Sequence, residues 1–195
     1  MIMVSLNFGT YLGTRLITDS KVHYDFTCSI DNMIPLWPVF VIFYVLAYVQ
    51  WVVGYVRIGM ENKRFCYQIM YGECIAKLIT LGFFLLLPTT MVRPELTGHD
   101  PFSYLLKFIY LLDEPNNLFP SIHCIESIVC MRAALLMKDT PNWFRWTNVV
   151  MTIGVCMSTV LVKQHVVADI VGAIVIVEIG LQAGKYLFRN VDMQN

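Results

Sequence analysis

Long apolar stretches alternate with short polar segments along this chain. Residues 34–56 carry no charged side chain and are long enough to cross a bilayer core of about 30 Å. Comparable stretches follow at about 67–91, 121–138, 146–162 and 166–188. The weakly apolar segment 2–18 contains Arg15 and could add a short sixth helix. The pattern predicts an all-α integral membrane bundle of five or six transmembrane helices.

The segment 92–120, between the second and third predicted spans, is rich in turn-forming residues. Within it, residues 102–112 have the pattern of a short amphipathic helix, which we expect to lie at the membrane interface. No repeat, low-complexity tract or linker divides the chain, so we expect one domain over 1–195. In this domain a short N-terminal segment, 1–33, precedes the core bundle, 34–188.

Composition agrees with a membrane protein and excludes several other classes. Hydrophobic residues make up 57% of the chain and charged residues only 14%, whereas a soluble domain carries about 25% charged residues. Fourteen basic residues balance fourteen acidic ones, and no basic stripe is present that would indicate a nucleic-acid partner. We therefore expect the bilayer itself to be the main partner.

Charge in the predicted loops is distributed unequally and indicates an orientation. One set of loops carries the basic residues Arg57, Lys63, Arg64, Arg132, Lys138, Arg145, Lys185 and Arg189. The opposite set carries mainly acidic residues, namely Asp19, Asp25, Asp31, Glu95, Asp100, Asp113 and Glu114. Because basic loops stay in the cytoplasm, we expect the 92–120 loop and the 163–166 turn to share the outer face.

Several ionisable residues lie at the outer ends of predicted spans. His123 and Glu126 lie at the end of one span, His165 and Asp169 at the end of another, and Arg93 just beyond a third. Such groups are costly in a membrane and are functional-site candidates by default. The sequence therefore predicts a site at one membrane face, built from three helix ends.

The chemistry of this set suits a phosphorylated substrate. Asp169 follows His165 by four residues, so one helical turn brings its carboxylate to the imidazole and leaves the other ring nitrogen as a base or nucleophile. His123 can serve as general acid, and Arg93 offers a planar fork for phosphate oxygens. Ser121 opens a helix, whose free N–H groups form an anion site.

Three sequence motifs resemble those of the type-2 phosphatidic acid phosphatase superfamily. Pro120-Ser121-Ile122-His123 resembles the Pro-Ser-x-His motif of that family, and Ser158-Thr159-x5-His165-x3-Asp169 resembles its Ser-Arg-x5-His-x3-Asp motif. Arg93-Pro94 resembles the end of its Lys-x6-Arg-Pro motif. The similarity extends over about 31–188 and is greatest to short bacterial members, which are related to the inositol phosphorylceramide synthase branch.

The resemblance implies a role for each matching residue. His165 would be the nucleophile that becomes phosphohistidine, Asp169 its orienting group and His123 the general acid. Arg93 and Ser121 would hold the phosphate, and neither a metal nor another cofactor would be needed.

Two basic residues of the family motifs are replaced in this chain. The lysine of the first motif falls at Leu86 and the arginine of the third at Thr159. Lys163 is the expected substitute, because it would lie one turn from Thr159 if the helix continued that far.

Other polar residues in the spans have two possible explanations each. Glu126 and Ser158 could tune the two histidines, although Glu126 could equally be a structural hydrogen-bond partner. Glu73 and Lys77, four residues apart, are expected to pair within the bundle. Glu178 could face Lys77 or Arg132.

The sequence therefore predicts a metal-independent lipid phosphatase acting on a phosphomonoester or diphosphate of a membrane lipid, such as a phosphatidic acid-like lipid or a polyprenyl diphosphate. One alternative is a phosphotransferase of the sphingolipid or inositol-lipid synthase kind, which would pass the group to an alcohol. Another is a non-catalytic module that binds lipid phosphates. The expected location is a bacterial plasma membrane, with the site on the extracytoplasmic face.

Overall fold

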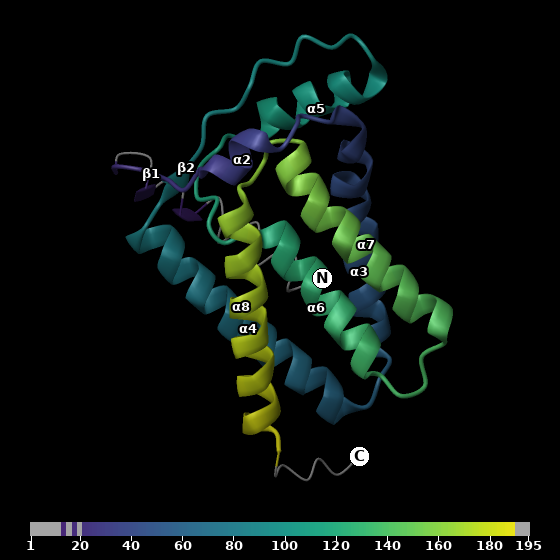
Figure 1. Cartoon of the computed structure of the whole chain (residues 1–195). Coiled ribbons are helices and arrows are strands. Elements are labelled where there is room, and N and C mark those ends of the chain that lie inside the picture. The colour runs from purple at the N-terminus through teal and green to yellow at the C-terminus, as the bar shows by residue number, and fades with distance from the viewer. Residues whose placement is uncertain (1–12, 15–16, 19–20, 190–195) are drawn as a thin grey trace.

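A computed structural model describes residues 13–14, 17–18 and 21–189 (Figure 1). Most of the proposed short helix at 2–18 lies outside the described residues. The helices are α2 (Ser29–Met33), α3 (Val41–Gly59), α4 (Lys63–Leu86), α5 (Pro101–Leu112), α6 (Ile122–Leu136), α7 (Asn142–Leu161) and α8 (Val167–Leu187), with a 3-10 turn η1 (Pro38–Phe40) before α3. Two short parallel strands, β1 (Tyr24–Asp25) and β2 (Thr89–Thr90), pair at one end of the bundle.

Four helices are long and apolar enough to cross a membrane within the described part of the chain. They are α3 together with η1, α4, α7 and α8. The predicted all-α membrane bundle agrees with this arrangement, whereas the predicted count of five or six spans is not confirmed. The predicted span at 121–138 corresponds to α6, which has 15 residues. At 1.5 Å per residue this helix is only about 22 Å long.

The short helix α6 lies among the long ones. It packs against α3, α7 and α8, and more weakly against α4, and most of its side chains are buried. Because α6 is enclosed by protein, it can carry Glu126 and Ser127, both fully buried, where a lipid-facing helix could not.

Capping residues and prolines explain where the predicted spans shift. Asn62 accepts a hydrogen bond from the backbone N–H of Phe65 at 2.9 Å and so starts α4 four residues before the expected position. The same helix ends at Leu86 instead of residue 91. Pro88 follows this end, and the next two residues form β2.

Helices α4 and α8 approach closely through small residues. A Cβ atom on Gly72 would lie 2.8 Å from the carbonyl oxygen of Gly180, and one on Gly184 would also meet the backbone of α4. Small residues at such positions allow membrane helices to pack backbone against backbone.

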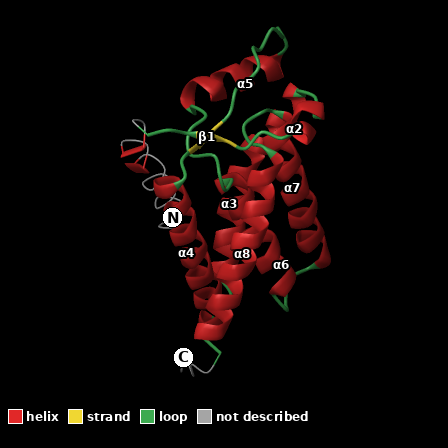
Figure 2. Ribbon diagram, turned by 60° about the vertical axis from the view of Figure 1, so that its left-hand side comes forward, coloured by secondary structure: helices red, strands yellow, loops and turns green. Residues whose placement is uncertain are grey.

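The helix α5 lies across the end of the bundle that carries α2 and β1 (Figure 2). Asp100 caps it by accepting hydrogen bonds from Phe102 and Ser103 at 3.0 and 3.1 Å. Leu106 on its inner side is fully buried against Val41 of α3 and Val162. The outer side exposes the apolar residues Tyr104, Phe108, Leu111 and Leu112.

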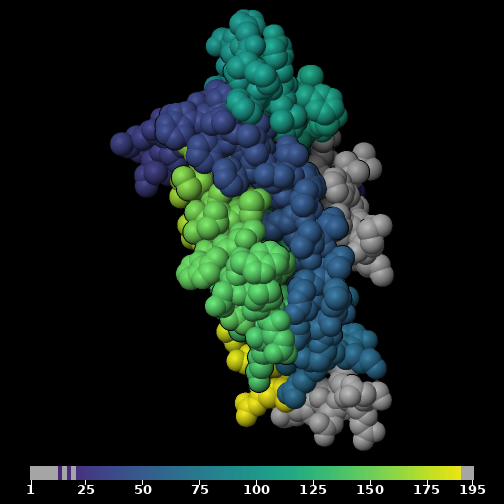
Figure 3. Space-filling model, turned by 90° about the vertical axis from the view of Figure 1, so that its right-hand side faces the viewer, coloured from purple at the N-terminus to yellow at the C-terminus, as the bar shows by residue number. Residues whose placement is uncertain are grey.

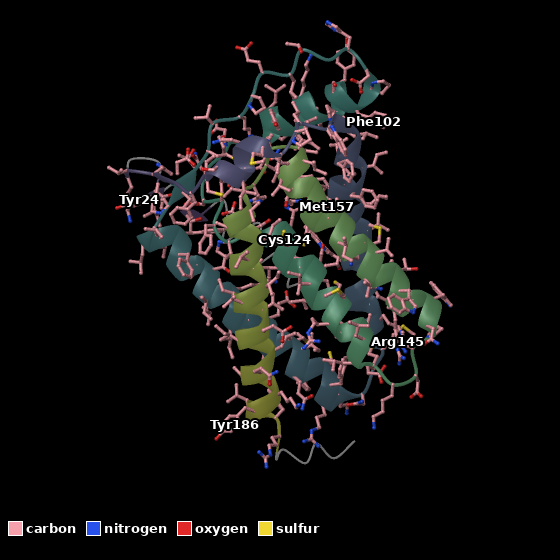
Figure 4. All side chains as sticks on the ribbon, viewed as in Figure 1. Tyr24, Phe102, Cys124, Arg145, Met157 and Tyr186 are labelled. Atoms are coloured by element: carbon pink, nitrogen blue, oxygen red, sulfur yellow. The ribbon has the colours of Figure 1, made fainter. Side chains whose placement is uncertain are left out.

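A broad apolar surface is formed by α3 and α7, which lie side by side in Figure 3. Their exposed residues include Val49, Val52, Val150 and Ile153. Such a surface suits contact with lipid chains. Arg145 lies toward the end of the bundle away from α5 (Figure 4).

Candidate functional site

The end of the bundle below α5 brings together several of the polar residues predicted from the sequence. There α6 begins at Ile122, α7 ends at Leu161 and α8 begins at Val167. Figure 4 labels Cys124, the residue after His123, in the half of the bundle nearer α5. The ends of α6, α7 and α8 therefore lie in one region, whereas the third helix end predicted from the sequence was that of the span before Arg93.

The predicted pairing of His165 and Asp169 is present. His165 lies in the turn before α8, and its Nδ1 is 3.0 Å from Oδ2 of Asp169. The same carboxylate oxygen accepts a hydrogen bond from the backbone N–H of Val166 at 3.2 Å. Because Asp169 is only 1% exposed, the imidazole is held firmly, and Nε2 is left for chemistry.

A tight turn fixes the position of His165. The backbone N–H groups of Gln164 and His165 both donate to the carbonyl oxygen of Thr159, at 3.0 Å each. Lys163 adopts a left-handed conformation with φ 54°, and α7 has already ended at Leu161. The helix does not continue to Lys163, so this residue does not share a helical face with Thr159.

The second histidine, His123, is surrounded by aromatic rings. Its ring stacks on Tyr44 with centroids 4.0 Å apart, and Tyr48 and Trp51 lie at 5.5 and 5.1 Å. The Nε2 atom is buried without a hydrogen-bond partner in the described structure. The imidazoles of His123 and His165 are close enough to interact electrostatically. The two histidines are therefore brought together, and His123 retains an unused polar atom.

Ser121 joins the two histidine motifs. As the N-cap of α6, its Oγ accepts a hydrogen bond from Cys124 at 3.4 Å, and its backbone N–H donates to the carbonyl oxygen of Asp169 at 3.3 Å. The start of α6, where free N–H groups favour anions, is thereby tied to the first turn of α8.

Arg93 reaches the same region from the loop after β2. Its guanidinium donates to the carbonyl oxygen of Asp113 and to Oε1 of Gln164, and it lies 4.6 Å from the ring centroid of Tyr110. Burial raises the pKa of Tyr110 to about 12, although Arg93 opposes the shift. The phenol hydroxyl therefore stays protonated at neutral pH and donates to the carbonyl oxygen of Val162 at 2.7 Å.

Gln164 is a site residue that sequence reasoning missed. Its side chain is almost fully buried, and because a guanidinium only donates, the amide oxygen must face Arg93. The Nε2 donor then has no partner, and neither has Nε of Arg93, within the part of the chain that is described. Two unsatisfied donors next to His165 are what a bound anion would complete. Only its place beside His165 in the motif could have suggested Gln164.

Lys163 is not directed as expected for a phosphate ligand. Its ammonium donates to the backbone carbonyl oxygens of Asp31 and Ile34, at 2.8 and 2.7 Å. It thereby fastens the N-terminal segment around α2 to the turn that holds His165.

Asp31, also missed from the sequence, strengthens that attachment. Its Oδ1 accepts the backbone N–H of Val167 at 2.7 Å, and its Oδ2 accepts that of Cys28 at 2.9 Å. Burial acts to raise the pKa of Asp31, but the hydrogen bonds from Cys28 and Val167 and the charge of Lys163 outweigh it and lower that pKa.

The proposed tuning residues have other partners. Oγ of Ser158 donates within its own helix to the carbonyl oxygen of Val155 at 2.7 Å. The carboxylate of Glu126 is engaged by Tyr55 and Lys77, which agrees with the structural alternative for this residue.

The remaining ionisable residues of the bundle pair as the sequence suggested. Lys77 forms the expected ion pair with Glu73. Arg132 pairs with Glu178 at 2.6 Å, one of the two partners considered for that carboxylate.

Comparison with models of known families, with characterised proteins and with solved structures yields no match. Among the described residues, no group of three or more histidine, cysteine, aspartate or glutamate side chains could hold a metal ion. The arrangement of the site itself therefore carries the functional interpretation.

Proposed function

We propose that this protein is a lipid phosphatase that works through a phosphohistidine at His165 without a metal ion. The observation that carries the proposal is the 3.0 Å contact between Nδ1 of His165 and the buried carboxylate of Asp169. This contact fixes the tautomer with the hydrogen on Nδ1, so Nε2 presents a lone pair. A second imidazole, His123, lies within electrostatic range of it.

In the first step, Nε2 of His165 attacks the phosphorus atom of the lipid. The N–P bond forms as the bond from phosphorus to the leaving oxygen breaks, and His123 gives a proton to that oxygen. Burial and the neighbouring His165 lower the pKa of the His123 imidazole, so this step relies on the negative charge of the bound phosphate to stabilise the imidazolium. Asp169 stabilises the positive charge that develops on the His165 ring. In the second step, water gives a proton to His123 and attacks phosphorus, and the N–P bond breaks.

Negative charge on the phosphate oxygens needs fixed donors in both steps. Arg93 and the amide of Gln164 supply donors that have no partner in the described structure, and the N-terminus of α6 adds its backbone dipole. Donors held in place before the reaction stabilise the transition state without having to reorganise.

The substrate is proposed to be a membrane lipid, because α5, which contacts Arg93 through Tyr110, has an exposed apolar side. The outer side of α5 exposes Phe108 and Leu111, which suits an interfacial helix. The charge of the loops favours an extracytoplasmic site, and we propose a bacterial plasma membrane as its location.

A phosphotransferase is the second candidate, and the position of Lys163 favours it. With the Lys163 ammonium bound to backbone carbonyls, Arg93 is the remaining cation among the predicted phosphate ligands. One cation matches the single charge of a phosphodiester better than the double charge of a phosphomonoester. The same phosphohistidine would then pass its group to an alcohol.

The proposal is tested by phosphate release from a panel of lipid phosphates in detergent with EDTA present. The expected result is release that persists in EDTA and is lost in His165→Ala and His123→Ala. His99→Ala is the matched control, because His99 lies exposed in the loop before α5. Release that survives in His165→Ala would refute the assignment, and release only after an acceptor alcohol is added would favour the transferase.

A further inference from the structure

A second polar cluster lies inside the bundle, where α3, α4 and α6 meet. It consists of Tyr55, Glu73, Lys77 and Glu126, and we call it the buried carboxylate cluster. Glu73 and Glu126 are fully buried, and the side chain of Lys77 is 11% exposed. The proposed reaction uses none of these four residues.

The contacts within the cluster link all four side chains. The ammonium of Lys77 pairs with Glu73 and lies 3.2 Å from Oε1 of Glu126. The hydroxyl oxygen of Tyr55 lies 2.7 Å from Oε1 of Glu73 and also contacts Oε2 of Glu126. Tyr55 is therefore a bridge between two carboxyl groups.

Counting hydrogens at this bridge shows that one is missing. A phenol hydroxyl has one hydrogen and can donate to only one of the two carboxylates. If both carboxyl groups were ionised, the second carboxylate oxygen would face the phenol oxygen of Tyr55 with no hydrogen between them. A hydrogen on either carboxyl group corrects this, because the carboxylic acid then donates to Tyr55 while Tyr55 donates to the other carboxylate.

The charge balance of the cluster leads to the same conclusion. Two carboxylates against one ammonium leave a net negative charge in the interior, where uncompensated charge is costly. Among the described residues, the thiols of Cys74 and Cys130 also interact with the cluster, and neither supplies a positive charge. On α8, Glu178 is already paired with Arg132.

We infer that the buried carboxylate cluster is a proton-binding site, which holds one proton along the bridge from Glu126 through Tyr55 to Glu73 at neutral pH. The proton makes the cluster electrically neutral and gives every contact at Tyr55 a hydrogen. This inference does not depend on the proposed lipid chemistry.

Proton binding at this site makes the stability of the bundle depend on pH. The folded protein retains a proton that exposed glutamates release at neutral pH, so the folded state binds more protons than the unfolded state. Stability then falls as the pH rises. The loss comes from a carboxylate charge that appears between α3, α4 and α6.

Infrared difference spectroscopy of the full chain in lipid vesicles tests the inference directly. At neutral pH the wild type should show the carbonyl band of a protonated carboxyl group. Glu126→Gln should remove this band, because the amide can donate to Tyr55 and accept from Lys77 in place of the acid. Glu73→Gln should also remove it, because either substitution leaves one carboxylate for the one ammonium, and Glu178→Gln, the matched control, should leave it unchanged.

Thermal unfolding at several pH values gives a second readout. The midpoint of the wild type should fall between neutral and alkaline pH, and the variant that lacks the band should lose this slope. Tyr55→Phe should shift the band, which assigns it to the bridge even if a glutamine variant fails to fold. No band in the wild type, or a band unaffected by all three variants, would overturn the inference. So would a midpoint that depends on sodium at constant ionic strength, because sodium would then balance the charge.

Discussion

Replacing Asp169 by asparagine isolates the contribution of its charge to the proposed reaction. One carboxylate oxygen, Oδ2, accepts hydrogen bonds from both His165 and Val166, whereas Oδ1 is buried without a partner. The asparagine oxygen can therefore keep both hydrogen bonds, and its NH2 group occupies the unused position. The start of α8 and the histidine tautomer should both be preserved.

The expected loss follows from the difference between a charged and a neutral acceptor. A hydrogen bond to a charged group contributes about 1.5–3 kcal/mol, compared with about 1 kcal/mol for a neutral one. The difference, about 0.5–2 kcal/mol lost from the transition state, corresponds to a roughly 2- to 30-fold lower rate. Because Asp169 is 1% exposed, water does little to weaken the effect.

The assay is the initial rate of phosphate release, measured beside thermal unfolding. Asp169→Asn should lower kcat by this factor and leave the unfolding midpoint close to that of the wild type. Asp169→Ala should lower both quantities, since it also removes the cap of α8. A rate for Asp169→Asn within twofold of the wild type would refute the proposed role of the charge.

Three further changes test other parts of the structure. Gly180→Ala should destabilise the protein by about 1–3 kcal/mol, because its Cβ would meet the backbone of α4. Gly82→Ala is the control, because a Cβ there meets open space, and the two variants are compared by unfolding in detergent. Lys163→Met should lower the unfolding midpoint with little effect on KM, whereas Arg93→Lys should raise KM. Equal effects of the two variants on KM would show that Lys163 also binds phosphate. The lowered pKa of Asp31 means that its contribution is present above its ordinary pKa and is lost as the pH falls below it. Asp31→Asn should therefore flatten the acid side of the stability profile, and an unchanged acid limb would contradict this.

The sequence predicted the architecture well where the signal was local. Uncharged stretches identified the long helices, and the spacing of His165 and Asp169 identified their contact. The predicted span at 121–138, which corresponds to α6, is not confirmed as a transmembrane helix, because periodicity cannot distinguish a short helix enclosed by other helices from one that crosses a membrane. The 15 residues of α6 form an apolar stretch whether the helix faces lipid or other helices.

The residues that sequence reasoning missed depend on long-range contacts. Asp31 reaches Val167 across 136 positions of the chain, and no local pattern indicates such a pairing. Lys163 was expected to bind phosphate because α7 was assumed to continue, whereas the turn after Leu161 directs its ammonium to the segment around α2. Gln164 becomes recognisable only through its hydrogen bond with Arg93.

The central claim is that His165 carries a covalent phosphoryl group during turnover. The most direct test is to mix the protein with a labelled lipid phosphate in EDTA, to stop the reaction during turnover, and to measure the label that is bound to the chain. We predict an acid-labile, base-stable label that maps to the peptide containing His165 and is absent from His165→Ala. Turnover of the lipid without any label on His165 would contradict the claim.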